Sequence, residues 1–193
     1  MAYSVLKLGD MIKEIGEDMC KQLIANFSCP LDLDIEYFLK EKAILFEHLG
    51  ISRTYLVYAS YQGENVLVGY FAIANKTLTI RKGISKSLRK KLTGTKTSEI
   101  KTIPVYLIGQ LSKNFKDGLD KLNLISGEEL LRLAFKKIIE AQNVAGGRII
   151  LVECMDVLKL REFYERYGFR VYSQDNEDGL LRYIREIKGI TLL

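Results

Sequence analysis

The sequence predicts a mixed α/β protein of the α+β kind, in which helices flank a mostly antiparallel sheet. Two hairpins predict the antiparallel part: residues 53–60 and 66–74 flank the turn YQGEN, and residues 169–174 and 180–187 flank the turn DNEDG. Between them, a strand–helix–strand run over 103–154 needs a crossover connection. Such crossovers are right-handed and make their two strands parallel. The predicted order is therefore β-α-α-β-β-loop-β-α-β-α-β-β.

The N-terminal part is predicted to hold one strand and two helices. The alternating segment 4–8 indicates a short strand, and Asp10 is placed to cap a helix that runs to about Asn26. Apolar residues recur at helical spacing in 33–49, and Gly50 is placed to end that second helix.

A block of one charge sign follows the first hairpin. Between residues 76 and 101 the only acid is Glu99, and a short helix is expected over 85–92. The basic residues of this block are Lys76, Arg81, Lys82, Lys86, Arg89, Lys90, Lys91, Lys96 and Lys101. Such a block attracts polyanions, and with nucleic acid it does so through counterion release. The alternative is a solvated loop that happens to be basic.

The middle of the chain predicts a buried strand followed by the clearest helix. Residues 103–111 form a nearly continuous apolar run, which is typical of a central strand. In 126–142 apolar residues share one face, Ser126 is placed to cap the helix, and Glu129 completes a capping box.

The last strand–helix unit lies between two glycine signals. Gly146 and Gly147 end the preceding helix, and residues 148–154 read as another buried strand. A helix is expected over 156–167, with Asp156 as N-cap and Gly168 just past its C-terminus.

Composition limits the classes of function. With 193 residues, 48% of them hydrophobic, the chain is expected to form a single domain over 1–193. The three cysteines are widely spaced and there is one histidine, His48, so neither a disulfide framework nor a metal centre is expected. No run is apolar and long enough to cross a bilayer, and the N-terminus lacks the apolar region of a signal peptide. A cytoplasmic protein without membrane contact is the expectation.

These segments, in this order, resemble the GNAT acetyltransferases, which use acetyl-CoA. The resemblance covers essentially the whole chain and rests on IPVYLIGQLSK, on the helix that opens at SGEELL, and on REFYERYGF. FSCPLDLDIEYFL, residues 27–39, and VGYFAIA also resemble segments of the toxin-type branch, which acetylates the amino group of aminoacyl-tRNA. The resemblance implies a GNAT-like sheet whose central parallel strands splay apart. By analogy with toxin-type relatives, it also suggests a homodimer.

The resemblance also implies which residues hold acetyl-CoA. Leu111, Ser112 and Lys113 would lie beside the pantetheine and acetyl group, chiefly through their backbone. A helix N-terminus binds pyrophosphate through its unpaired N–H groups, and the family has Arg/Gln-x-x-Gly-x-Gly/Ala there. Only the last glycine of that pattern survives, since Leu122 and Ile125 hold the first and middle positions. The pyrophosphate candidates are Leu122, Asn123, Ile125, Ser126, Gly127 and Glu128. The alternative is a plain strand-to-helix turn.

Tyr164 is the candidate general acid. Helical spacing puts Val157, Leu160, Tyr164 and Tyr167 on one face, which by itself favours a core tyrosine. In many GNAT enzymes, however, the tyrosine of a (Leu/Phe)-Tyr-x-x-x-Gly-Phe segment protonates the leaving thiolate, and Tyr164 holds that place. Phe163 and Tyr167 are expected to pack, and Val157 stands near a position where the family often has Asn.

The acceptor is expected to be an amine. Glu153 could relay its proton through water, and the alternative for Glu153 is a salt bridge or a place on the polar rim of the sheet. His48 is expected to have a surface or packing role. This shortage of bases favours an amine of low pKa, about 7.7–8 for an α-amine, such as that of an aminoacyl-tRNA. The phosphates of that tRNA would contact Arg81, Lys82, Arg89, Lys90 and Lys91. A small-molecule amine, a protein amine, or a degenerate GNAT domain that only binds its partner are the alternatives.

Overall fold

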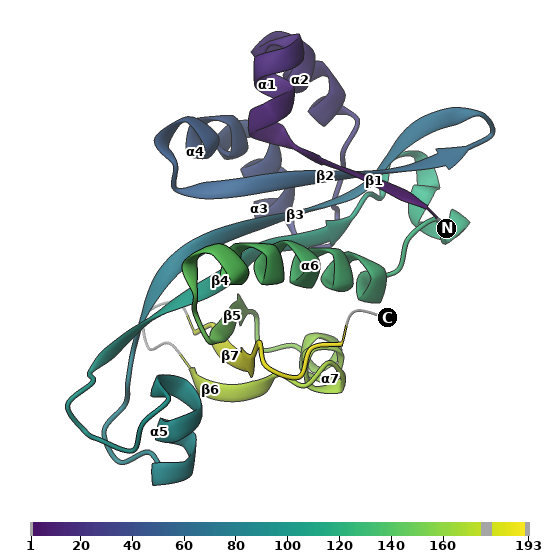
Figure 1. Ribbon diagram of the computed structural model, residues 1–193. Coiled ribbons are helices and arrows are strands. Elements are labelled where there is room, and N and C mark those ends of the chain that lie inside the picture. The colour runs from purple at the N-terminus through teal and green to yellow at the C-terminus, as the bar shows by residue number, and fades with distance from the viewer. Residues whose placement is uncertain (1, 175–178, 192–193) are drawn as a thin grey trace. The chain divides into compact units, whose positions relative to one another are not determined.

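The computed structural model describes residues 2–174 and 179–191 and contains one mixed sheet (Figure 1). The strand order is β1-β2-β3-β4-β5-β7-β6. The strands are β1 (Tyr3–Lys7), β2 (Ser52–Tyr61), β3 (Glu64–Thr79), β4 (Thr102–Lys113), β5 (Ile149–Cys154), β6 (Arg170–Gln174) and β7 (Leu181–Glu186). The pairs β1–β2, β2–β3, β5–β7 and β6–β7 are antiparallel, whereas β4 and β5 are parallel. The predicted sheet is therefore confirmed.

The chain divides into two compact units, which are described separately. The first consists of Met1–Ala74 and Gly109–Lys136, and the second of Asn75–Ile108 and Lys137–Leu193. The single domain over 1–193 stays a prediction.

Helices of the first unit cover β1 and β2 on one side (Figure 1). They are α1 (Leu8–Ile15), α2 (Glu17–Ala25), α3 (Leu33–Tyr37), a π-helical turn (Phe38–Lys42) and α4 (Ala43–Leu49). They bury an apolar cluster that includes Leu8, Phe27, Leu39 and Tyr70. Burial of such side chains drives folding of this unit, at roughly 25 cal/mol per Å² of apolar surface.

The helix predicted from Asp10 to Asn26 is wrong in two respects. It begins earlier, because Lys7 is the N-cap and Asp10 lies inside α1. It is also interrupted at Gly16, whose φ of 81° is a left-handed conformation that glycine adopts without a Cβ clash. The second predicted helix and its left-handed C-cap at Gly50 are confirmed, with the π-helical turn in its middle.

The second unit packs the basic helix and the C-terminal strands around a separate core. Helix α5 (Lys86–Thr93) is capped by Ser85, whose Oγ accepts a hydrogen bond from Leu88 N at 3.1 Å. The buried Leu92 joins a cluster that includes Ile103, Ile149 and Ile184. The predicted short helix over 85–92 is thus confirmed and is anchored by an apolar residue.

Helix α7 (Leu158–Arg166) ends as predicted but does not begin as predicted. Its N-cap is Val157 without a side-chain cap, and Asp156 instead pairs with Arg161 through bonds of 2.5 and 2.6 Å. At the other end Phe169 N donates to Tyr164 O, and Gly168 has φ 79°. This is a Schellman motif, in which only glycine is free of strain at the left-handed position.

The hairpin of β6 and β7 is confirmed, while most of its predicted turn, DNEDG, lies outside the described residues.

Candidate active site

The end of β4 is held in place by a buried asparagine. Asn114 is 2% exposed, and its Nδ2 donates to Asn26 O and Leu67 O at 2.7 and 2.8 Å. Its Oδ1 accepts hydrogen bonds from Ser28 N and Lys116 N, both at 2.9 Å. A buried amide with its hydrogen bonds satisfied fixes the backbone that it joins. The strand residues before it, Leu111–Lys113, therefore have a defined path.

Strands β3 and β4 approach each other unusually closely next to these residues. A Cβ built on Gly69 would lie 2.7 Å from Ser112 O and 2.9 Å from Leu130 Cδ1, so a larger residue does not fit there. Ser112 is buried, and its Oγ bonds with Cys29 Sγ and Lys113 O. The Ser112 hydroxyl therefore serves packing, which agrees with the expectation that backbone groups matter more than side chains here.

The parallel pairing of β4 with β5 ends before β4 does. It joins Tyr106–Ile108 to Ile150–Val152, and β4 continues over Gly109–Lys113. A strand that outlasts its partner presents backbone N–H and C=O groups on that edge. Leu111–Lys113 are the predicted pantetheine contacts, and they lie in this continuation.

The linker between β4 and α6 contains a short 3₁₀ segment and two buried anchors. The 3₁₀ segment is Lys116–Leu122, and Asn123 follows it with a left-handed φ of 49°. Leu124 and Ile125 are buried, whereas Leu122 is 44% exposed. Ile125, which holds the middle glycine's place in the family pattern, is thus a core anchor. Its side chain plays a packing role there.

Helix α6 (Gly127–Ala145) caps its own N-terminus. Ser126 Oγ accepts a hydrogen bond from Glu129 N at 3.1 Å, while Glu129 Oε2 accepts one from Ser126 N at 2.8 Å. This is the predicted capping box, and it engages the amide of Ser126, a predicted pyrophosphate contact. Burial raises the pKa of Glu129, but hydrogen bonds from Tyr3 and Ser126 outweigh it and leave the pKa below its usual value. A carboxylate therefore stands where an anion is expected to bind.

Tyr164 lies in the second unit and is buried among aromatic rings. Its side chain is 7% exposed and packs against Phe163, Phe169 and Tyr183, with ring centroids 5.1–5.9 Å apart. No residue in the described part of the chain hydrogen-bonds to its hydroxyl. Burial, and then the nearby Cys154 thiol, raise the pKa of Tyr164 well above its usual value. The hydroxyl thus keeps its proton at neutral pH.

The helical face predicted around Tyr164 is only partly buried. Val157 is 43% exposed because it is the N-cap residue and precedes the helix. Tyr167 is half-buried and, like Phe163, takes part in ring packing, with a centroid distance of 5.1 Å between the two. The packing roles expected for Phe163 and Tyr167 agree with these contacts.

Glu153 lies near the end of β5 in the second unit, where its mostly buried side chain forms two ion pairs. Lys76 Nζ lies 2.5 Å from one carboxylate oxygen and Arg182 Nε 2.8 Å from the other. Burial raises the pKa of Glu153, but the bonds from Lys76 and Arg182 outweigh it, so the pKa lies below its usual value. A carboxylate held ionised by two cations is a weak proton acceptor. The contacts favour the salt-bridge alternative over the proton relay.

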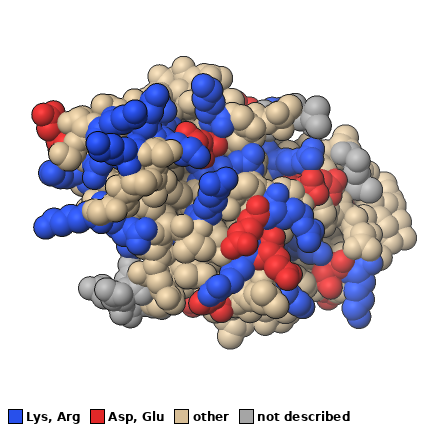
Figure 2. Space-filling model, turned by 90° about the horizontal axis from the view of Figure 1, so that it is seen from below, with Lys and Arg blue, Asp and Glu red and all other residues tan. Residues whose placement is uncertain are grey.

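The predicted phosphate-binding cations lie on α5 and in the segment just before it. Arg81 lies over the ring of Tyr172 at 4.7 Å, and Arg89 donates to Ile100 O at 3.2 Å. Lys90 and Lys91 lie in the last turn of α5. Lys and Arg side chains gather at the left end of the face in Figure 2, where α5 lies in Figure 1.

The remaining polar candidates have structural roles. His48 is exposed and bonds with Glu17 Oε1 at 2.7 Å, which is a surface contact. Within residues 2–174 and 179–191, no group of His, Cys, Asp and Glu is arranged to hold a metal ion. The described helices include none that is long and apolar enough to cross a membrane.

Comparison with solved structures identifies the fold. The toxin AtaT in the AtaTR complex bound with acetyl-CoA matches with a TM-score of 0.68 and 20% identity, over 96% of this chain and 94% of that one. A mutant of KacT that carries phenylalanine in place of a tyrosine matches with a TM-score of 0.65 and 20% identity, over 95% of each chain. The fold is GNAT-like.

A third solved structure has the same GNAT-like fold. AtaT complexed with acetyl-methionyl-tRNAfMet matches with a TM-score of 0.65 and 20% identity, over 93% of this chain and 94% of that one. The sequence matches no family model and none of the curated proteins. At this identity the match lies in backbone arrangement.

Within the GNAT-like fold, the predicted site residues fall into two groups. The β4 end and the α6 start belong to the first unit, and Tyr164, Glu153 and the basic residues belong to the second. Two residues that no sequence pattern singled out also stand out: Asn114 fixes the end of β4, and Arg170 lines a pocket together with residues of α5. Asn114 stands three residues after the apolar run 103–111, so a polar residue just beyond a predicted strand was the available signal. Arg170 gave no signal, because the fold alone brings it to the basic helix.

Proposed function

We propose that the protein is an acetyl-CoA-dependent N-acetyltransferase whose acceptor is the α-amine of an aminoacyl-tRNA. The observation that carries this proposal is Tyr164, a buried tyrosine whose hydroxyl keeps its proton and has no hydrogen-bond partner within the described chain. Such a hydroxyl is available to donate to a ligand atom. The GNAT-like fold supports the reaction class by analogy.

The residues of the β4 end fit the cofactor. Backbone groups of Leu111–Lys113 would pair with its amide-containing arm, and the bonds of Asn114 keep that backbone in one conformation. The α6 start fits less well, because Glu129 occupies the amide of Ser126. When bound, acetyl-CoA supplies an acetyl group activated as a thioester. Gly127 and Glu128, in the first turn of α6, stay proposed contacts for its pyrophosphate, together with the backbone of Leu122, Asn123 and Ile125.

Tyr164 would hold the proton that the departing sulfur needs. A thiol has a pKa of about 8.5, so its thiolate already leaves readily, and a general acid adds about 10²–10⁴-fold. The described site offers no strong base, since Glu153 is held by Lys76 and Arg182. An α-amine of pKa about 7.7–8 is roughly 9–17% neutral at pH 7 and needs little help.

The choice of acceptor rests on charge and on the solved toxins. The cations Arg81, Lys82, Arg89, Lys90 and Lys91 would contact tRNA phosphates. AtaT has been solved with acetyl-methionyl-tRNAfMet, a product of this reaction class. Purified protein with labelled acetyl-CoA should transfer label to charged tRNA and not to polyamines or peptides. Label on polyamines or peptides alone would move the acceptor to a small or protein amine.

The self-capped α6 favours a second candidate, a GNAT-like domain that binds its partner without catalysis. The capping box and the single surviving glycine of the phosphate pattern both weaken pyrophosphate binding at α6. Calorimetry with coenzyme A separates the two. Binding in the micromolar range supports the transferase, and no binding supports the non-catalytic domain.

A further inference from the structure

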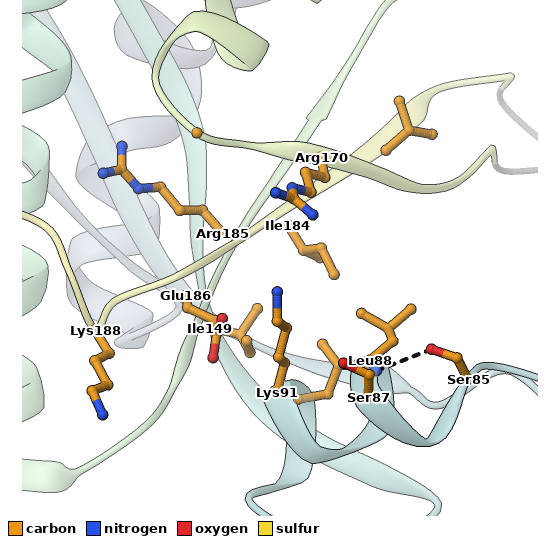
Figure 3. A pocket seen from close by; sticks show the side chains of 13 residues that line it. Ser85, Ser87, Leu88, Lys91, Ile149, Arg170, Ile184, Arg185, Glu186 and Lys188 are labelled. Carbon is orange, nitrogen blue, oxygen red and sulfur yellow. Dashed lines mark hydrogen bonds between the residues drawn. The ribbon is translucent and has the colours of Figure 1, made fainter.

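A pocket in the second unit lies between α5 and the C-terminal strands (Figure 3). Its volume is about 490 Å³, within the range of roughly 300–1,000 Å³ typical of small-ligand sites. Its basic side chains come from separate parts of the chain: Lys91 from α5, Arg170 from β6, Arg185 from β7, and Lys188. We call it the Lys91–Arg170 pocket.

Two of these cations converge without a neutralising partner. Lys91 and Arg170 point toward one another across Ile184 (Figure 3). Neither forms an ion pair with an acid of the described chain. By contrast, Lys76 and Arg182, elsewhere in the second unit, both pair with Glu153. Cations that face each other repel, so their approach is unfavourable unless an anion lies between them. The pocket therefore favours an anion between Lys91 and Arg170.

The other charged groups of the pocket do not neutralise Lys91 and Arg170. Arg185 points away from the pair and donates a hydrogen bond to Tyr167 O at the end of α7. Glu186 is the one acid that lines the pocket, and it forms no ion pair within the described chain. Its carboxylate lies beside Ile149 in Figure 3, away from the tips of Lys91 and Arg170.

The floor of the pocket is apolar, which strengthens the attraction between its cations and an anion. Leu88, Leu92, Ile149 and Ile184 line it, and all except Leu88 are buried core residues. Ionic interactions beside apolar groups are screened less than those in open water. The hydroxyl of Ser87 adds a hydrogen-bond donor at the rim. Converging cations, a hydroxyl and an apolar floor suit a phosphate group.

We propose that the Lys91–Arg170 pocket binds a phosphate group of an RNA. The basic side chains of Lys86, Arg89 and Lys90 lie on the same helix as Lys91, and α5 contains no acid. A single small phosphate would not need this flanking charge, whereas a polynucleotide places further phosphates along it. The choice of RNA rests on the proposed function, and the pocket gives that acceptor an anchoring point beyond α5 itself.

Titration of uncharged tRNA, followed by fluorescence anisotropy at several salt concentrations, tests the pocket without requiring acetyl transfer. Arg170→Gln and Lys91→Gln should each weaken binding. Each should also lower the slope of log K against log salt by about 0.7–0.9, the value for one lost phosphate contact. The double variant should weaken tRNA binding by less than the product of the two single-variant factors, because both cations contact one phosphate.

The matched control is Lys13→Gln, which removes one exposed lysine of α1 in the first unit. Equal binding by Arg170→Gln and Lys13→Gln would overturn the proposal, even if charge removal on α5 weakened binding. Glu186→Gln provides a test of opposite sign. It removes a negative charge, which repels the phosphate, and should tighten tRNA binding about twofold. Unchanged or weaker binding would count against the pocket.

Coenzyme A separates this proposal from the proposed function. Calorimetry should give Arg170→Gln and the unchanged protein the same affinity for coenzyme A. A lower affinity in Arg170→Gln would assign the pocket to the cofactor and overturn the RNA proposal. If tRNA binds through Arg170 but is never acetylated, the transferase proposal fails alone. If no tRNA binds, the pocket proposal fails while acetylation of a small amine survives.

Discussion

The Tyr3 hydroxyl lies 2.7 Å from a carboxylate oxygen of Glu129, so the first strand holds the residue that caps α6. The other carboxylate oxygen accepts hydrogen bonds from Ser126 N and Oγ, both at 2.8 Å. An acid here stabilises the positive end of the helix. The same acid repels an anionic ligand that approaches that end. Helix stability and pyrophosphate binding are therefore opposed at this residue.

Glu129→Gln should raise the affinity for coenzyme A about two- to fivefold. The amide keeps the shape of the cap but removes the negative charge, worth about 0.5–1 kcal/mol near a helix terminus. Isothermal titration calorimetry measures the change. Glu140→Gln, in the last turns of the same helix, is the control and should leave the affinity unchanged. Equal affinity in all three proteins would mean that the pyrophosphate does not bind at the α6 N-terminus.

Tyr164→Phe should slow acetyl transfer by about 10²–10⁴-fold while coenzyme A affinity and stability stay nearly constant. The hydroxyl has no hydrogen-bond partner within the described chain, so its loss leaves no buried group unsatisfied. Single-turnover rates isolate the chemical step. Tyr167→Phe, which alters a neighbouring ring in the same aromatic cluster, should keep the rate. A chemical step of unchanged rate in Tyr164→Phe would remove this residue from the mechanism.

Glu153→Gln should destabilise the protein at pH 7 and much less at pH 3. The pKa of Glu153 is lowered in the folded state, because the bonds from Lys76 and Arg182 outweigh its burial. A lowered carboxyl pKa contributes stability above its unfolded value, about 4.3, and that contribution is lost as the pH falls through the folded value. Urea unfolding at the two pH values measures the difference.

The control for this pH dependence is Glu162→Gln, which changes an exposed acid of α7. It should give similar unfolding free energies to the unchanged protein at both pH values. If Glu153→Gln were as stable as the unchanged protein at pH 7, the two ion pairs would contribute nothing.

Asn114→Ala should lower the free energy of unfolding by about 2–4 kcal/mol. It removes the hydrogen-bond partner of several buried backbone groups at the end of β4. Chemical denaturation should show a lower midpoint with an unchanged slope. Asn143→Ala, on the exposed surface of α6, should stay within about 0.5 kcal/mol. A midpoint for Asn114→Ala that matched Asn143→Ala would show that water replaces the lost bonds.

The sequence by itself determined the strand and helix order, the hairpins, the parallel pair and the capping box at Ser126. The order, the hairpins and the capping box depend on local periodicity, on glycine conformations and on contacts within a few residues. The parallel pair follows from the strand–helix–strand order and the handedness of its crossover. The same local reasoning failed at Asp10 and Asp156, because a capping residue is recognised by its type, while its neighbours decide whether it caps. Arg161 engages Asp156, and α1 begins before Asp10.

Only the tertiary structure decided which distant residues meet. Lys76 and Arg182 hold Glu153 because β3 and β7 bring them to β5, and Arg170 faces Lys91 because β6 and α5 line the same pocket. Asn114 becomes a buried junction only because two separate segments, one with Asn26 and Ser28 and one with Leu67, close around it. Local patterns are set by neighbours in the chain, whereas ion pairs, buried amides and pockets depend on contacts across the fold, which no local pattern encodes.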